Sequence, residues 1–164
     1  MKKDKINPVL TIMCGFPKSG KSTWIEKNKN FLEDIIVSPD EIRRIIFGHQ
    51  YHQNAEPFIW AFAEGMTRML LEQGRNVIVD ATNTTYSGRV RWIIIARNYD
   101  VKLRIIWIKT SLEECLKRNK KSLKDKLIPE DVMRQMEVRF EEPYAQKTSD
   151  DKNYCIELIE VNKF

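Results

Sequence analysis

The sequence predicts an α/β fold, with a central parallel sheet of about five strands and helices on both of its faces. Short apolar stretches typical of strands lie near residues 9–14, 35–38, 76–79, 103–108 and 154–161. Segments with the spacing of amphipathic helices lie between them. Strands that alternate with helices in this way form a parallel sheet covered on both faces. The chain has 164 residues, 42% of them hydrophobic, so we expect a single domain over residues 1–164.

A glycine-rich stretch, "GFPKSGKST", follows the first strand and has the spacing of a phosphate-binding loop, Gly15-x-x-x-x-Gly20-Lys21-Ser22. Its glycines let several backbone N–H groups turn toward one anion. The helix that begins in "STWIEK" directs its positive end to the same place. A glycine-rich turn with a helix cap is the alternative interpretation. We expect a nucleoside triphosphate to be bound by Gly15, Phe16, Pro17, Lys18, Ser19, Gly20, Lys21, Ser22 and Thr23.

Three side chains in or near this loop are candidate ligands of the phosphates or of a magnesium ion. Lys21 would reach the β- and γ-phosphates, so we expect its ammonium group to face the solvent, and the Ser22 hydroxyl would bind Mg²⁺. Asp80 ends the third strand, in "VIVDATN". An aspartate at the end of a strand beside a phosphate loop commonly holds the magnesium ion, directly or through water. A turn or cap role for Asp80 is the alternative.

The second strand is followed by "SPDEIRR", which has the features of a helix start. Ser38 is a good cap, Pro39 suits the first helical position, and acidic residues favour the first turn. Asp40 and Arg43 lie one helical turn apart. Asp40 is either part of this helix start or a catalytic carboxylate, and Arg43 either forms a surface ion pair with it or binds a ligand.

The remaining helices are predicted at 56–73, 86–98, 111–120 and 129–140. Gly74 ends the first of them, Ser111 and Glu114 form a capping box for the third, and Pro129 begins the fourth. Three tryptophans in apolar patterns, Trp60, Trp92 and Trp107, are expected in the core. The spacing of the 56–73 helix predicts a buried face made of Phe58, Phe62, Met66, Met69 and Leu70.

Composition excludes some classes of protein. The three cysteines, Cys14, Cys115 and Cys155, are far apart and lack a CxxC spacing, which argues against a disulfide framework or a zinc site and favours the cytoplasm. His49 and His52 are interpreted as polar loop residues and not as zinc ligands. The start of the chain imitates a signal peptide, but its apolar part runs into the phosphate loop, and no run is long enough for a membrane span. The net charge of +5 suits a polyanionic partner.

The ordered set of motifs resembles the kinase domain of the 5′-hydroxyl polynucleotide kinases, which are small P-loop kinases. The resemblance covers nearly the whole chain. It rests on "GFPKSGKSTW", "SPDEIR", "VIVDATN", "GRVRW", "ECLKRN", "IPEDVMRQM" and "RFEEP". The resemblance implies a P-loop kinase fold, ATP and Mg²⁺ as cofactors, and a nucleic acid with a 5′-hydroxyl end as the acceptor.

The resemblance also implies roles for individual residues. Asp40 would be the general base and Arg43 would touch the nucleic acid. Arg118 would bind the transferred phosphate from a lid near 113–128, together with Lys21. The acceptor would further contact Thr82, Asn83 and Arg89.

The sequence departs from the family pattern at two places. Pro39 stands where the family often has arginine, and the lid has lysines in place of a second arginine. Charge stabilisation would then depend mainly on Arg118, with Lys120 or Lys121, because lysine cannot reproduce a guanidinium fork. Lys124 and Lys126 are interpreted as solvated. Two alternatives stay open, a kinase of another hydroxyl acceptor and a nucleotide-binding switch module, and the sequence does not set the oligomeric state.

Overall fold

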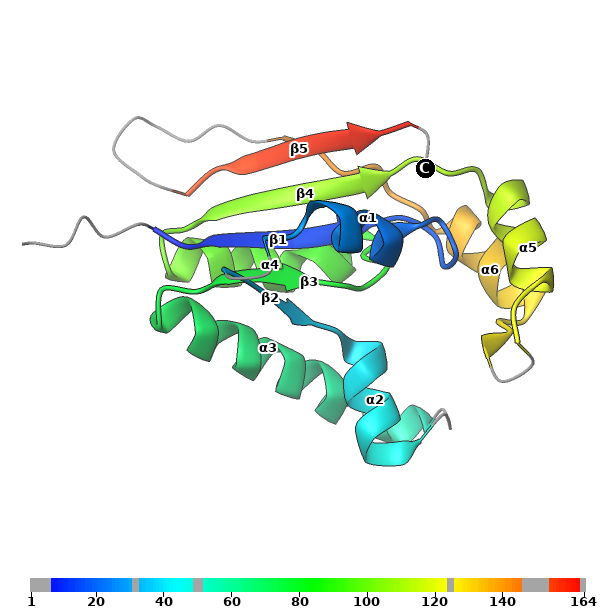
Figure 1. The fold of residues 1–164 in the computed structure, drawn as a ribbon, viewed down its shortest axis with the longest axis horizontal. Coiled ribbons are helices and arrows are strands. Elements are labelled where there is room, and N and C mark those ends of the chain that lie inside the picture. Colours follow the sequence, from blue (N-terminus) through cyan, green and yellow to red (C-terminus); the bar gives the residue numbers. More distant parts are fainter. Residues whose placement is uncertain (1–6, 31–32, 49–51, 124–125, 146–153, 163–164) are drawn as a thin grey trace, which may run out of the picture.

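A five-stranded sheet runs through the computed structural model, which describes residues 7–30, 33–48, 52–123, 126–145 and 154–162. Every neighbouring pair of strands is parallel, and the order across the sheet is β2-β3-β1-β4-β5 (Figure 1). The α/β class with about five parallel strands is therefore confirmed. The strands are β1 (Val9–Cys14), β2 (Asp34–Val37), β3 (Asn76–Val79), β4 (Lys102–Ile108) and β5 (Ile156–Val161).

Strand β1 lies at the centre of the sheet because it is apolar on both faces. It pairs with β3 on one side and with β4 on the other. Leu10 and Ile12 join the larger core cluster on one face, and Met13 joins the smaller cluster on the other. A strand buried on both faces has a continuous apolar sequence, as "VLTIMC" has. The phosphate loop therefore leaves from the most enclosed strand.

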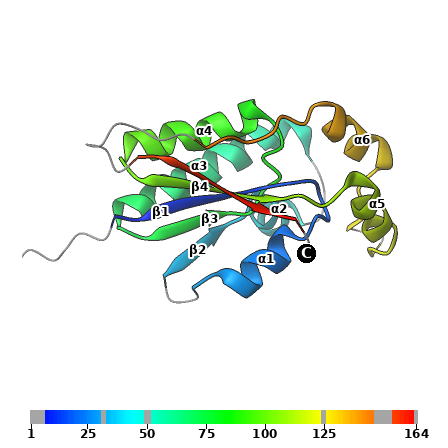
Figure 2. The ribbon, with the colours of Figure 1, turned by 90° about the horizontal axis from the view of Figure 1, so that it is seen from above.

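The helices divide between the two faces and the carboxyl end of the sheet. α3 and α4 cover one face, and α1 lies against the other (Figure 2). α5 and α6 stand beyond the carboxyl ends of the strands (Figure 1). In the described part of the chain, none of the helices has the length and apolar character to cross a membrane. The helices are α1 (Lys21–Asn28), α2 (Pro39–Phe47), α3 (Glu56–Glu72), α4 (Tyr86–Asn98), α5 (Leu112–Lys120) and α6 (Glu130–Val138), with a 3₁₀ turn η1 (Gln53–Ala55).

Side-chain caps fix the starts of two of the predicted helices. The Ser38 hydroxyl accepts a hydrogen bond from the Glu41 N–H at 3.3 Å, and Pro39 is the first helical residue of α2. The Ser111 hydroxyl accepts one from the Glu114 N–H at 3.4 Å at the start of α5. Both predicted caps are confirmed.

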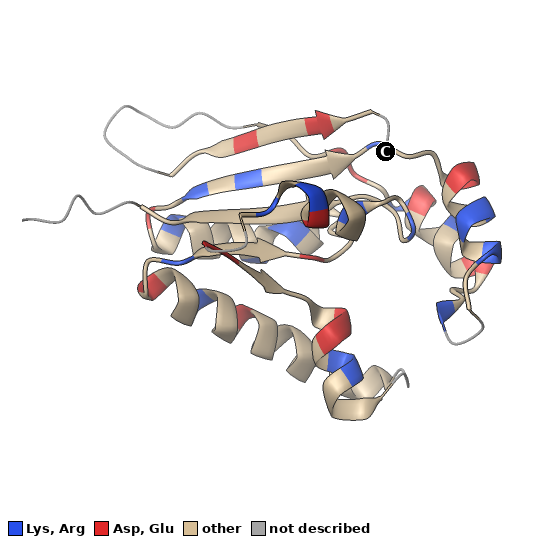
Figure 3. Ribbon diagram, viewed as in Figure 1, with Lys and Arg blue, Asp and Glu red and all other residues tan. Residues whose placement is uncertain are grey.

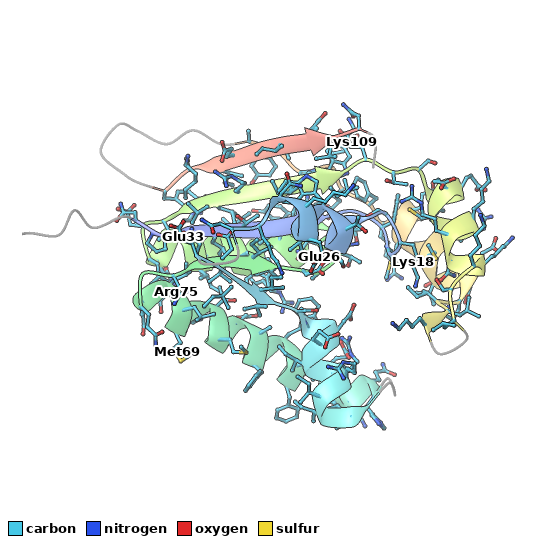
Figure 4. All side chains as sticks on the ribbon, viewed as in Figure 1. Lys18, Glu26, Glu33, Met69, Arg75 and Lys109 are labelled. Carbon is cyan, nitrogen blue, oxygen red and sulfur yellow. The ribbon has the colours of Figure 1, made fainter. Side chains whose placement is uncertain are left out.

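The predicted buried face of α3 is right for Leu70, which is buried, and for Met66, which packs against the core, but wrong for Phe58, Phe62 and Met69. Ile59 and Ala63 are buried against the sheet, whereas Phe58 is 76% exposed and Phe62 is 55% exposed. Figure 4 shows Met69 on the side of α3 turned away from the sheet. Both stripes are apolar at helical spacing, and the smaller side chains face the sheet. Among the tryptophans, Trp92 and Trp107 are buried as predicted, while Trp60 is only half-buried.

Candidate active site

The phosphate loop makes a close turn at Gly15. The φ angle of Gly15 is +145°, and a Cβ there would lie 2.9 Å from the Ile108 carbonyl oxygen. The Gly15 N–H donates to the Thr82 carbonyl at 2.9 Å, which ties the loop to the segment after β3. Only glycine adopts this backbone conformation without strain and fits so close to β4. The start of the loop therefore depends on Gly15.

The end of the loop offers N–H groups to an anion. Gly20, with φ of 107°, precedes α1 and provides no side-chain cap, and the first helical bond runs from the Trp24 N–H to the Gly20 carbonyl. The N–H groups of the first turn of a helix have no partner within the helix. The Ser19 hydroxyl is buried and has no partner among the described residues, a rare state for a native polar group. These features fit the phosphates of a nucleotide.

Lys21 is buried, although its ammonium group was predicted to face the solvent. Its side chain is only 8% exposed, so it does not face the solvent freely. Its ammonium group donates to the carbonyls of Gly15 at 3.1 Å and Phe16 at 2.7 Å, and burial lowers the pKa of Lys21. Lys21 nevertheless lines the cleft described below. When a phosphate binds, the Lys21 ammonium group would exchange its carbonyl partners, which carry only partial negative charges, for a group with a full negative charge.

A hydroxyl and a carboxylate meet beside Lys21. The Ser22 hydroxyl donates to Asp80 Oδ2 at 2.8 Å. Burial raises the pKa of Asp80, against the opposing effects of this hydrogen bond and of the Lys21 ammonium group. Oxygen donors of this kind are the ligands that Mg²⁺ prefers, usually with several waters and substrate phosphates. Ser22 and Asp80 thus fit a magnesium ion.

Asp40 is held by an arginine on its own helix. Arg43 donates to Asp40 Oδ1 at 2.5 Å through one nitrogen, and to both carboxylate oxygens of Glu56 at 2.7 and 2.9 Å through two others. The Asp40 side chain is 87% exposed, whereas those of Arg43 and Glu56 are about 20% exposed or less. The hydrogen bonds that Arg43 donates to Glu56 raise the pKa of Arg43, which keeps it cationic. Glu56 was not found from the sequence because it lies 13 residues beyond Arg43.

A cleft of about 510 Å³ brings most of the predicted residues together at the carboxyl end of the sheet. Such a position is where ligands of open parallel sheets bind. The cleft also has apolar walls that the sequence did not identify, formed by Trp60, Ile128 and Met136. The predicted site residues that line it are Pro17, Lys18, Lys21, Ser22, Asp40, Arg43, Asp80 and Thr82.

Two predicted acceptor contacts are wrong. Arg89 is 2% exposed, and its guanidinium donates to the carbonyls of Asn83 at 2.9 Å and Glu142 at 3.3 Å. Asn83 is 5% exposed, donates to the Met13 carbonyl at 2.8 Å and accepts from the Trp92 indole at 3.1 Å. Both side chains are used inside the protein, so neither is available to a nucleic acid. They hold the loop after β3 in place.

Arg118 contacts the outer side of the phosphate loop. Its guanidinium donates to the carbonyls of Lys18 at 3.3 Å and Ser19 at 3.2 Å, and it pairs with Glu114 at 2.9 Å. Arg118 therefore connects α5 to the phosphate loop. Figure 4 shows Lys18 on the side of the loop that faces α5.

The turn after α5 is fastened to the helix by Asn119. Its side-chain amide donates to the Ile128 carbonyl at 2.7 Å and accepts from the Ile128 N–H at 3.1 Å. Asn119 is 5% exposed, so this pair of bonds is shielded from water. Ile128 is thereby fixed in the wall of the cleft opposite α2.

The segment with the sequence "RFEEP" closes the back of the site. The ring of Phe140 lies 5.4 Å from Phe16 of the phosphate loop and 5.7 Å from Trp107, measured between ring centroids. The Glu141 N–H donates to the Thr84 carbonyl at 2.9 Å. This segment supports the two loops that carry the predicted nucleotide and metal ligands.

Comparison with known proteins decides the family. A family model described as an AAA domain matches residues 10–143, which is most of the chain. The chain belongs to this family. The P-loop kinase fold expected from the sequence is thereby confirmed, and so is the resemblance to polynucleotide kinases.

Two curated relatives of this AAA-domain chain are kinases. It is 31% identical to L-seryl-tRNA(Sec) kinase of Methanococcus maripaludis over 94% of its own length and 62% of that protein. It is 25% identical to the bifunctional polynucleotide phosphatase/kinase of Schizosaccharomyces pombe over 84% of its length and 31% of that protein. The chain thus spans less than two thirds of each relative.

Solved structures agree with the family of this AAA-domain chain. A chain of the Pnkp1/Rnl/Hen1 RNA repair complex superposes with a TM-score of 0.70 at 25% identity, over 80% of this chain and 43% of that one. Chaetomium thermophilum Kti12, solved in complex with ADP-AlF3, gives a TM-score of 0.68 at 17% identity, over 92% and 88% of the two chains. The second likeness concerns the fold alone. The chain therefore belongs to the AAA-domain family and has the P-loop kinase fold.

Proposed function

We propose that this P-loop kinase transfers the γ-phosphate of ATP to the 5′-hydroxyl end of RNA or DNA. The observation that carries the proposal is Asp40, an exposed carboxylate that lines the same cleft as Lys21 and Asp80. A module that only binds nucleotide has no need of a positioned carboxylate at this place. The likeness to a chain of the Pnkp1/Rnl/Hen1 complex and to a polynucleotide phosphatase/kinase supports a nucleic-acid acceptor.

The reaction follows from the assigned residues. The Asp40 carboxylate accepts the proton of the acceptor hydroxyl while the hydroxyl oxygen attacks the γ-phosphorus. The new P–O bond forms as the bond between the γ-phosphorus and the β,γ-bridging oxygen breaks, and ADP leaves. Lys21 and Arg118 neutralise the charge that spreads over the transferred oxygens. Ser22 and Asp80 would hold a Mg²⁺ ion, which would supply positive charge to offset that of the phosphates.

Arg43 orients the base in this mechanism. It contacts Asp40 and is itself fixed by Glu56, so the carboxylate is held toward the cleft. Thr82 also lines the cleft and is retained as an acceptor contact. Arg43 has room to meet the phosphate nearest the reacting hydroxyl, because Arg donates up to five hydrogen bonds.

A second acceptor has an observation in its favour. The 31% identity to an L-seryl-tRNA(Sec) kinase extends over 94% of this chain. The acceptor would then be the hydroxyl of a seryl group carried by a tRNA. The same base and the same phosphate site serve either hydroxyl, so the two candidates differ only in how the acceptor is held.

A transfer assay with ATP labelled in the γ-phosphate separates these functions. The acceptors are a 5′-hydroxyl oligoribonucleotide, the same sequence as DNA, seryl-tRNA, and small alcohols. A 5′-phosphorylated oligonucleotide of the same sequence is the matched control, because it offers no 5′-hydroxyl. Label transfer to the first two and not to the control is expected. Transfer to seryl-tRNA alone would support the second candidate, and ATP hydrolysis that no acceptor stimulates would contradict both.

A further inference from the structure

Two grooves leave the cleft near Asp40. The first, the α2–lid groove, is about 390 Å³ and lies between α2 and residues 126–128; it shares Lys18, Asp40 and Arg43 with the cleft. The second, the α3–α4 groove, lies between those helices and shares Trp60 with the cleft. An acceptor longer than one nucleotide, with its reacting end at Asp40, can leave the cleft through the α2–lid groove, because Asp40 lines both.

The charges of the two grooves differ in sign. The α2–lid groove contains four cationic side chains, Lys18, Arg43, Arg44 and Lys126, and two carboxylates, Asp40 and Glu41. The α3–α4 groove contains one guanidinium, that of Arg91, and two carboxylates, Glu56 and Glu64. Figure 3 shows basic positions on both α2 and the region of α5. A phosphate backbone is attracted to the first groove and repelled by the second.

The cations of the α2–lid groove are accessible. Arg44 is paired with Glu41 at 2.7 Å, but its side chain is 49% exposed, and such surface ion pairs are weak enough to exchange partners. Lys126, interpreted from the sequence as a solvated side chain, lines this groove opposite α2. The turn that carries it is held by the Asn119 bonds to Ile128, so its position is defined.

The groove also has an apolar edge. Leu127, which is 45% exposed, and its neighbour Ile128 form this edge. Proteins bind single-stranded nucleic acid with cations that contact the phosphates and with apolar surface that contacts sugars and bases. The α2–lid groove offers both.

We propose that the acceptor strand runs from Asp40 through the α2–lid groove, with Arg44 and Lys126 binding phosphates beyond the first nucleotide. This inference rests on the proposed function for the reacting 5′-hydroxyl end, but the groove's affinity for a polynucleotide does not depend on turnover. Arg44 and Lys126 act on acceptor length and not on the chemical step.

Direct binding tests the groove without transfer. Fluorescence anisotropy measures the dissociation constant of labelled 5′-hydroxyl oligoribonucleotides of two, four and eight residues with ADP present. The variants are Arg44→Gln, Lys126→Gln and the double variant. Arg91→Gln is the control for the other groove, and Lys27→Gln on exposed α1 is the control for lost charge. We expect the double variant to weaken eight-residue binding about tenfold and two-residue binding less than twofold. Each lost phosphate contact should also lower the slope of log affinity against log salt by about 0.7.

The control variants show whether the acceptor strand follows the α2–lid groove or the α3–α4 groove. Arg91→Gln and Lys27→Gln should bind all lengths within twofold of the wild type. An equal or larger loss in Arg91→Gln, unchanged binding in the double variant, or no binding by the wild type would overturn the proposal. A wild type that binds by length through Arg44 and Lys126 but transfers no phosphate would instead contradict the proposed function and leave the groove assignment standing.

Discussion

Asp40 owes its position to its neighbours on α2. The hydroxyl of Ser38, not the carboxylate of Asp40, caps the helix, and Asp40 is instead bonded to Arg43. Asp40 lies in the first turn of α2, as the helix-start interpretation predicts, and it also lines the cleft, as a catalytic carboxylate would. Its 87% exposure also means that little stability depends on it.

Replacing Asp40 tests its catalytic role. We expect Asp40→Asn to lower transfer about 100-fold or more, because the amide cannot accept the proton, while the melting temperature stays within about 1 °C of the wild type. Transfer to the preferred acceptor and thermal melting measure the two effects. Turnover near the wild-type rate would remove Asp40 from the mechanism.

Glu56 acts on Asp40 through Arg43. We expect Glu56→Gln to lower kcat about 10- to 100-fold with the KM for ATP unchanged, because Arg43 loses its charged partner and no longer fixes the carboxylate. Steady-state kinetics with varied ATP measures both constants. Glu64→Gln, which removes the other carboxylate of the α3–α4 groove, one that pairs with Arg91 instead of Arg43, is the matched control. An equal loss in both variants would indicate a general effect of lost charge.

Asp80 is well placed to hold a metal ion, but its burial disfavours the ionised form of its carboxyl group. Its pKa is raised by burial, and this net shift already includes the attraction to Lys21. The ionised carboxylate thus destabilises the folded state at pH values above its folded pKa, and the penalty disappears as the pH falls through that pKa. We expect ligand-free Asp80→Asn to melt higher than the wild type at pH 7, with a smaller difference toward pH 4, and to lose Mg²⁺-dependent transfer. Melting curves over this pH range provide the measurement, and a lower melting temperature at pH 7 would contradict the assignment.

At the scale of elements, α3 shows what periodicity can and cannot predict. The existence and bounds of the helix were predicted closely, but two adjacent stripes of it are apolar. Periodicity gives the angle between residues and not which of two apolar stripes meets the sheet. That choice depends on the space above β2 and β3, which suits Ile59 and Ala63 and leaves Phe58 outside.

A pair of neighbouring variants tests this assignment. We expect Ile59→Ala to lower the free energy of unfolding by about 2–5 kcal/mol, because a cavity forms in the core. Phe58→Ala should change it by about 0.5 kcal/mol or less, as an exposed side chain does. Chemical denaturation measures both. A larger loss in Phe58→Ala would mean that the exposed stripe is covered in solution.

For the molecule as a whole, the sequence predicted the order of the helices and strands better than it predicted the tertiary contacts between them. Each of the five strands and the loop at Gly15 were found because glycines, caps and apolar runs are local signals. Glu56 and Asn119 were missed because their partners are fixed only by tertiary packing. Arg89 was assigned to the acceptor by the family resemblance of "GRVRW", whereas in the structure its guanidinium donates to carbonyl groups of two loops.

Nucleotide binding should stabilise the molecule as a unit. At about 100 times its dissociation constant, a ligand of the native state adds about 2.7 kcal/mol, or roughly 5–11 °C in melting temperature for a domain of this size. We expect ATP with Mg²⁺ to produce a shift of this order in the wild type. Lys21→Ala should lose most of the shift and at least about 100-fold of transfer. Circular dichroism checks that the variant is folded, and a full shift in a folded Lys21→Ala would show that the loop binds nucleotide without this lysine.

The central place of β1 has a consequence for how the chain is made. β1 precedes both of its neighbours in the sequence, and they begin at residues 76 and 102. During synthesis the edge that pairs with β3 stays open until residue 79 has left the ribosome, and the edge that pairs with β4 stays open until residue 108 has left it. Pairing over such sequence distances is slow, and open apolar edges invite association with other chains. A strand placed to anchor the nucleotide loop in the finished protein is, in the nascent chain, the segment in greatest need of a chaperone.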